Sequence, residues 1–193
     1  MKKTLTIILA FALVIAMSVA GTVAYLTSQD SVTNTFTVGK VAITLDEAKV
    51  DTNGAAVTSE GRVKANSYKL IPGHAYTKDP IIHVDANSEK CWLFVKVENG
   101  ISAIEDSANS AKTIAAQLAA NGWSAVNGAA NVYAYKESVA GGTNVPVFGS
   151  FKIAGDAAVA NYANATVVVT AYAVQADGFD TAAAAWTASG FRA

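Results

Sequence analysis

The sequence predicts a mainly β protein in which two sheets pack as a β-sandwich, with one or two short helices inserted between strands. Three observations support this fold class. Short runs of alternating apolar and polar residues, rich in Val, Ile and Thr, recur along the chain. Turn-forming pairs such as Asn-Gly, Pro-Gly, Gly-Gly and Asp-Gly separate these runs. Few stretches carry a helical pattern, which favours a sandwich over an α/β fold.

Residues 1–24 have the pattern of a secretory signal peptide that precedes the first strand. Lys2 and Lys3 form a basic head, and residues 5–20 carry no charge. A membrane-spanning helix needs about 20 apolar residues, so this shorter run predicts contact with the membrane only during export. The alternative is an N-terminal anchor that is retained.

Two cleavage positions are available in this segment, after Ala20 and after Ala24. Thr22 and Ala24 place small side chains where a signal peptidase selects them, which favours the second position. Tyr25 is then the first mature residue. Residues 25–193 are of the length expected for one domain that buries its own core.

The first strand of the mature chain is expected over residues 31–38. Val32, Asn34, Phe36 and Val38 share one face of this strand, and Ser and Thr residues occupy the other. The same kind of alternation predicts further strands over residues 41–45, 81–84, 91–98, 132–136, 147–153 and 166–174.

Two of these strands have the strongest patterns. Residues 91–98 alternate clearly, and Trp92 and Phe94 make the second face apolar at one end, so another element is expected to cover it there. Residues 166–174 are apolar on both faces, which predicts a strand in the centre of a sheet.

One amphipathic helix is expected over residues 107–120, packed on a sheet. Its apolar residues recur at helical spacing, and Asp106 or Ser107 can cap its start. Asn121 and Gly122 form a typical helix end. The helix is expected to lie between strands in the chain order.

Shorter features complete the pattern. Residues 156–161 predict a helical turn, and residues 181–186 predict a short helix that Asp180 caps. The pair Asn53 and Gly54 favours the positive φ of a hairpin turn. A helix–loop–helix calcium site at this position is not expected, because the loop lacks the closing glutamate.

The charge and cysteine content exclude several classes of protein. The chain has 14 basic and 15 acidic residues, a formal net charge of −1, and no polybasic patch. Binding to nucleic acid or to an anionic lipid surface is therefore not expected. The single cysteine, Cys91, rules out an intramolecular disulfide framework, and its apolar strand predicts burial rather than an intermolecular disulfide.

No residue pattern predicts a catalytic, cofactor-binding or metal site. His74, His83 and Cys91 could in principle converge on zinc, but their spacing matches no known helical His pair or His-Glu-x-x-His run. The chain also lacks a Gly-x-Ser-x-Gly nucleophile elbow and a phosphate-binding Gly-Lys-Ser loop. The sequence therefore favours a non-catalytic protein without a cofactor.

Several blocks of the sequence resemble the TasA/camelysin family of Gram-positive bacteria. The most specific block is the N-terminal one, and the match extends in patches over most of the chain. The blocks are residues 21–27 (GTVAYLT), 34–39 (NTFTVG), 41–45 (VAITL), 70–73 (LIPG), 77–80 (TKDP), 94–99 (FVKVEN) and 170–179 (TAYAVQADGF).

The resemblance implies a jelly-roll β-sandwich that a SipW-type signal peptidase releases outside the cell. Family members often assemble into biofilm matrix fibres by donor-strand complementation, in which an N-terminal strand of one subunit completes the sheet of the next. Residues 31–38 are the candidate donor strand here, with Phe36 and Val38 as inserted side chains. The expected partners are other copies of this chain or homologous matrix subunits.

Three alternatives remain open. Residues 31–38 can instead pair within their own subunit. The camelysin name implies a secreted metallopeptidase, although the chain shows no metallopeptidase motif. A surface adhesin or a fibre accessory protein that does not polymerise is the third alternative.

Overall fold

Antiparallel strands pair into three sheets in the computed structural model, which describes residues 39–191. The sheet orders are β1-β3-β7, β2-β8 and β5-β6-β4-β9. The mainly β class is therefore confirmed, with three sheets in place of the expected two. The strands are β1 (Ile43–Asp46), β2 (Ala75–Thr77), β3 (Ile81–Val84), β4 (Cys91–Asn99), β5 (Trp123–Ala125), β6 (Val132–Tyr135), β7 (Asn144–Pro146), β8 (Ser150–Lys152) and β9 (Val167–Gln175).

Three expectations lie outside the described residues. They are the signal peptide over residues 1–24, the cleavage position between Ala24 and Tyr25, and the donor strand over residues 31–38. Among residues 39–191, no helix combines the length and the hydropathy that a bilayer crossing requires.

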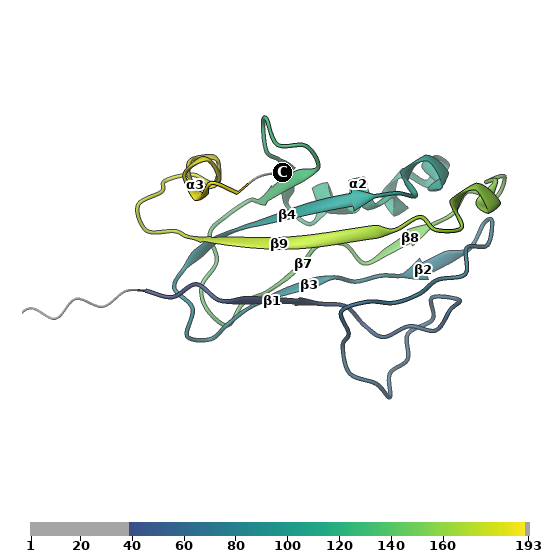
Figure 1. The fold of residues 1–193 in the computed structure, drawn as a ribbon, viewed down its shortest axis with the longest axis horizontal. Coiled ribbons are helices and arrows are strands. Elements are labelled where there is room, and N and C mark those ends of the chain that lie inside the picture. Colours follow the sequence, from purple (N-terminus) through teal and green to yellow (C-terminus); the bar gives the residue numbers. More distant parts are fainter. Residues whose placement is uncertain (1–38, 192–193) are drawn as a thin grey trace, which may run out of the picture. The chain divides into compact units, whose positions relative to one another are not determined.

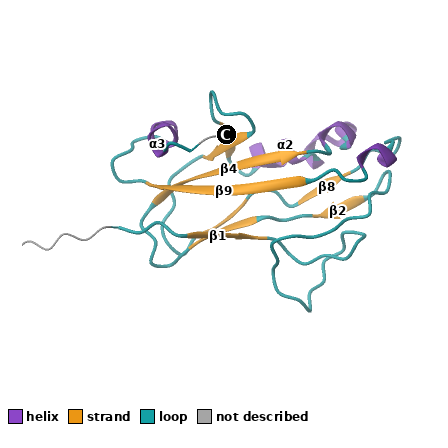
Figure 2. Ribbon diagram, in the orientation of Figure 1, coloured by secondary structure: helices purple, strands orange, loops and turns teal. Residues whose placement is uncertain are grey.

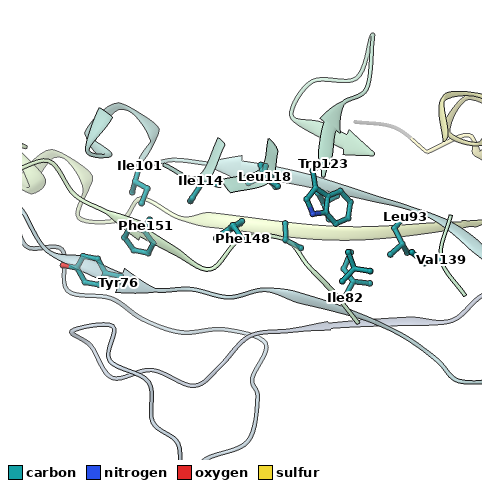
Figure 3. Close-up of a cluster of buried hydrophobic side chains, with 14 of the residues drawn as sticks. Tyr76, Ile82, Leu93, Ile101, Ile114, Leu118, Trp123, Val139, Phe148 and Phe151 are labelled. Carbon is teal, nitrogen blue, oxygen red and sulfur yellow. The ribbon is translucent and has the colours of Figure 1, made fainter. Parts of the chain in front are cut away.

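The sheets form two layers around one main core. Figure 2 shows β4 and β9 on one side, with β1, β2 and β8 on the other. Between them lies a cluster of buried side chains that includes Ile82, Leu93, Phe148 and Phe151 (Figure 3). Burial of this apolar surface is the main stabilising contribution to the fold.

Strand β4 carries the pattern that the sequence predicts. Cys91, Leu93, Val95 and Val97 are almost completely buried and face the main core. On the opposite face, Phe94 belongs to a second, smaller cluster under α3 (Ala182–Ser189). The expectation that another element covers this end of the strand is confirmed.

The expected helix over residues 107–120 is divided in two, so the prediction of one continuous helix is wrong. A 3-10 segment, η2 (Ser107–Lys112), is interrupted by the non-helical backbone of Asn109. The helix proper, α2 (Ile114–Ala120), begins only after Thr113, whose hydroxyl accepts a hydrogen bond from the N–H of Ala116. Asp106 and Ser107 therefore do not cap α2.

Other helix ends follow the sequence more closely. Asn121 ends α2, and Gly122 follows with a φ of 87°, a conformation that favours glycine. Thr181 rather than Asp180 caps α3, because its hydroxyl accepts a hydrogen bond from the N–H of Ala184. Two further 3-10 segments are η1 (Ser102–Ile104) and η3 (Val159–Tyr162).

The second cluster gives a test of the fold. Phe94 is fully buried, and its ring centroid lies 5.1 Å from that of Trp186 in α3. Phe94→Ala is expected to lower the free energy of unfolding by about 3–5 kcal/mol, since it removes an aromatic side chain from a closed site. Val168→Ala is the control, because Val168 is 43% exposed. Urea unfolding followed by tryptophan fluorescence measures both, and equal losses would contradict the assigned packing.

Candidate functional site: a groove along an unpaired sheet edge

Strand β9 lies at the edge of its sheet, so the prediction of a central strand is wrong. It pairs with β4 along nine residue pairs, from Cys91–Gln175 to Asn99–Val167. Both of its faces are apolar because the main core lies against one and α3 packs near the other. Apolar residues occur on both faces of β9 because each face packs against other elements, not because β9 has a neighbouring strand at both of its edges.

The hydrogen bonds at the two ends of this ladder show which backbone groups of β9 face outward. The N–H of Gly100 donates to the carbonyl of Thr166, and the N–H of Ala176 donates to the carbonyl of Lys90. In an antiparallel pair, alternate residues bond to the partner strand. Even-numbered residues of β9 thus bond to β4, and the backbone groups of Val167, Val169, Ala171 and Ala173 are directed away from it. No strand within residues 39–191 pairs with that edge.

An open groove of about 850 Å³ lies beside this edge. One wall is residues 162–171, which include the first half of β9. The other wall is the end of β1 together with residues 63–70. Val97 and Val95 of β4 are almost fully buried, whereas their partners on β9, Val169 and Ala171, are only half-buried. Among residues 39–191, the inner face of β9 is therefore incompletely covered on the side away from β4.

In the wall opposite β9, half-buried and exposed side chains alternate as in a β-strand, although residues 66–70 belong to none of the three sheets. Asn66, Tyr68 and Leu70 are half-buried, and the residues between them are exposed. The Tyr68 hydroxyl donates to the carbonyl of Thr77 at 3.1 Å, which fixes the segment against β2. Burial raises the pKa of Tyr68, and the nearby carboxylates of Glu47 and Asp79 raise it further. The hydroxyl therefore stays protonated and can donate this hydrogen bond.

A buried ion pair forms part of the lining of the groove. Lys78 Nζ is 2.6 Å from Glu47 Oε2, and both residues are at least nine-tenths buried. The Asn66 amide donates to Glu47 Oε1 at 3.0 Å. An ammonium has three donors, and Glu47 is the one side-chain acceptor that Lys78 contacts among the described residues. The groove thus combines apolar side chains with a buried charged pair.

Charged side chains also hold the rim of the groove in place. Arg62 bridges Asp46 and Asp79, with nitrogen–oxygen distances of 2.5 and 3.0 Å. His83 Nε2 lies 2.9 Å from Asp46 Oδ1. Partial burial opposes ionisation of Asp46, but the hydrogen bonds from Arg62 and His83 outweigh it and lower the pKa of that carboxyl. Lys64 Nζ donates to the outward-facing carbonyl of Leu45 at the β1 edge.

The structure does not bring His74, His83 and Cys91 together as a metal site. His74 Nε2 contacts the carbonyl of Asn53 at 2.8 Å, while His83 contacts Asp46. Cys91 is buried in β4, and this burial raises the pKa of its thiol to about 11. In the part of the chain that the structure describes, no three His, Cys, Asp or Glu side chains are placed to share a metal ion.

Residues 39–191 thus form a β-sheet domain in which a strand edge, unpaired within these residues, lies beside a partly apolar groove. A groove of this shape suits an extended chain, because alternate side chains enter it while the backbone pairs with the edge. Comparisons with protein-family models, with curated proteins and with solved structures find no match to this chain.

The ion pair gives a direct test of the groove. Lys78→Met leaves the buried Glu47 carboxylate without its cation, which is expected to lower the free energy of unfolding by about 3–5 kcal/mol. Adding Glu47→Leu is expected to recover most of that loss, since an apolar pair of similar volume has no charge to desolvate. Urea unfolding measures each variant. Lys96→Met is the control. Lys96 Nζ lies 3.4 Å from Oε1 of the well-exposed Glu98, so this substitution is expected to lower the free energy of unfolding by less than about 1 kcal/mol.

Proposed function

We propose that this chain is an exported structural subunit of a bacterial cell surface or biofilm matrix, and that it assembles into fibres by donor-strand complementation. In this proposal the described domain is a jelly-roll sandwich that lacks one strand. The groove beside β9 accepts residues 31–38 of another copy, after a SipW-type peptidase has removed residues 1–24. The edge of β9, with which no strand of residues 39–191 pairs, is the single observation that carries the proposal.

The composition of this edge supports an occupant. Residues 167–175 contain no charged residue and no proline. Proteins that keep an edge strand free usually protect it with a lysine, a proline or a bulge, because a bare edge pairs with other chains. A nine-residue edge that is uncharged, rich in valine and alanine, and without such protection would promote aggregation unless another strand covers it.

The path of the chain into β1 favours an occupant from another subunit. The N–H of Asp85 donates to the carbonyl of Ala42, and the N–H of Glu89 donates to the carbonyl of Lys40. The chain is thus already extended and paired from residue 40 onward. Residues 31–38 could reach their own groove only after a full reversal next to Gly39. In addition, β1 starts near the α3 end of the domain (Figure 1), whereas the groove extends toward η3.

This arrangement of donor and acceptor produces an open fibre. The start of β1 and the acceptor groove lie toward opposite ends of the described domain, so a donor that precedes β1 would make a head-to-tail contact. A heterologous contact of this kind leads to filaments when its rotation does not close a ring. Each inserted donor would also supply strand hydrogen bonds to the outward groups of β9, which no strand of residues 39–191 supplies.

Truncation tests the role of the donor. Residues 25–193 are expected to form filaments in negative-stain microscopy, and residues 39–193 are expected to remain single particles, because they keep the groove but lack the donor. Mixing the two in equal amounts is expected to shorten the filaments, since a truncated copy can accept a donor but cannot extend the chain. A full mature form that stays monomeric across salt and pH would contradict self-assembly and favour an accessory subunit or an adhesin.

A proline on the free edge tests the acceptor. Ala171→Pro removes an N–H that faces away from β4, so the ladder with β4 is expected to survive while pairing with a donor is lost. The critical concentration for filament formation is expected to rise by about tenfold or more. Ala171→Ser, which keeps the N–H, is the matched control. Circular dichroism of both monomers checks the fold, and filaments that form equally well from both variants would show that this edge is not the acceptor.

A further inference from the structure

The groove carries an ordered sequence of apolar and polar positions. Leu45 in β1 and Glu47, which follows the end of that strand, are two residues apart; Leu45 packs against the main core and Glu47 is buried. Lys78, the partner of Glu47, follows Tyr76 by two residues, and Tyr76 pairs with Phe151 across β2 and β8. Along the groove, an apolar position at Leu45 is therefore followed by the ion pair and then by an aromatic position at Phe151.

The candidate donor has the same order of apolar, polar and aromatic residues. Val32, Asn34 and Phe36 are two residues apart and share one face of residues 31–38. An apolar residue is followed by an amide and then by an aromatic residue. This match between two distant parts of the chain does not depend on which subunit supplies the donor.

We infer that Asn34 of the donor binds the Glu47–Lys78 pair of the acceptor and thereby fixes the register of the inserted strand. The inference rests on the proposed function and adds the recognition step to it. Val32 then lies beside Leu45, and Phe36 lies beside Phe151.

The chemistry of an amide suits this position. Its carbonyl oxygen accepts a hydrogen bond from the Lys78 ammonium, and its NH₂ group donates to the Glu47 carboxylate. A neutral group that does both satisfies an ion pair without adding a charge to the closed groove. Alanine, leucine or valine at position 34 would cover the pair and leave the remaining donors of Lys78 without a partner.

The same pair penalises other registers. A shift of two residues places Val32 or Phe36 on the ion pair and Asn34 against an apolar wall. Both errors leave buried polar groups unpaired. A single polar residue in an apolar interface is a known way to select one register, as in coiled coils.

The direction of the strand follows from the same match. With Val32 beside Leu45 and Phe36 beside Phe151, the donor runs in the direction of β1 and antiparallel to β9, since β1 and β9 have opposite directions (Figure 1). Gly39 of the donor subunit then emerges at the η3 end of the acceptor. The acceptor's own β1 begins at the opposite end, so successive subunits follow one another along a line.

A double-mutant cycle tests the contact in the full mature chain. Asn34→Leu is expected to raise the critical concentration for filaments by about 10- to 100-fold when the groove carries Glu47 and Lys78. In the Glu47→Leu/Lys78→Met background, Asn34→Leu is expected to have no such effect or to favour assembly. Thr35→Leu, on the opposite face, is the control and is expected to act equally in both backgrounds. Equal effects of Asn34→Leu in the two backgrounds would overturn the inference while leaving strand donation intact, whereas no filaments from the unmodified chain would overturn the proposed function itself.

Disulfide trapping tests the register without changing the ion pair. A chain with Val32→Cys is mixed with one carrying Leu45→Cys under mild oxidation, and a cross-linked dimer is expected. Val38→Cys with Leu45→Cys is the comparison and is expected to give little product. Cys91 is fully buried, so the unmodified chain supplies a low background. Preferential trapping through Val38 would overturn the proposed direction and register.

Discussion

The ladder between β4 and β9 is the interaction on which the rest of the structure depends. It joins two stretches more than 60 residues apart in the sequence, and its register fixes which side chains of both strands face the core. If β9 slipped by one residue against β4, Val169 and Ala171 would turn from the main core toward the α3 side of the sheet. The side chains that now face α3 would then enter the core in their place. The same register decides which backbone groups of β9 are left unpaired at the free edge.

The two edges that flank the groove are treated differently by the sequence. At the edge of β1, Lys64 Nζ donates a hydrogen bond to the outward-facing carbonyl of Leu45. Just beyond the strand, Val63 and Glu47 exchange backbone hydrogen bonds. Charged side chains of this kind discourage further pairing. The edge of β9 has no equivalent, because residues 167–175 are uncharged. The asymmetry indicates that an incoming strand would pair mainly with β9 and would contact the β1 side through its side chains.

Much of the fold is predictable where a local pattern decides it. Strand β3 occupies the predicted residues, and β4 exceeds its prediction by one residue, because both are short alternating runs between clear turns. The helix over residues 107–120 fails because Thr113 can begin a helix as well as Ser107 can, and the backbone of Asn109 leaves the helical region. Propensity alone does not choose between two adjacent caps.

The groove could not be predicted, because no local pattern encodes it. An apolar strand such as β9 has the same sequence pattern at the centre of a sheet and at an edge that a helix covers. Its position depends on which strands pair over long distances. The ion pair is equally hidden, since Glu47 and Lys78 are 31 residues apart and each has the pattern of a surface residue. The candidate donor, in contrast, could be chosen from sequence, because its alternation is local.

The location of the ion pair gives the groove two properties that an apolar groove would lack. Within residues 39–191 the groove is open, but Glu47 and Lys78 are at least nine-tenths buried, so their mutual contact and the hydrogen bond from Asn66 offset the cost of removing them from water. A fully apolar groove of the same size would be a surface for unspecific association. When a strand enters and water leaves, the same charges interact in a less polar environment, and only a strand with a matching polar group avoids leaving them unpaired. A charged pair in the lining of the groove therefore disfavours an occupant without a matching polar group more strongly than it disfavours one that has it, and specificity depends on this difference.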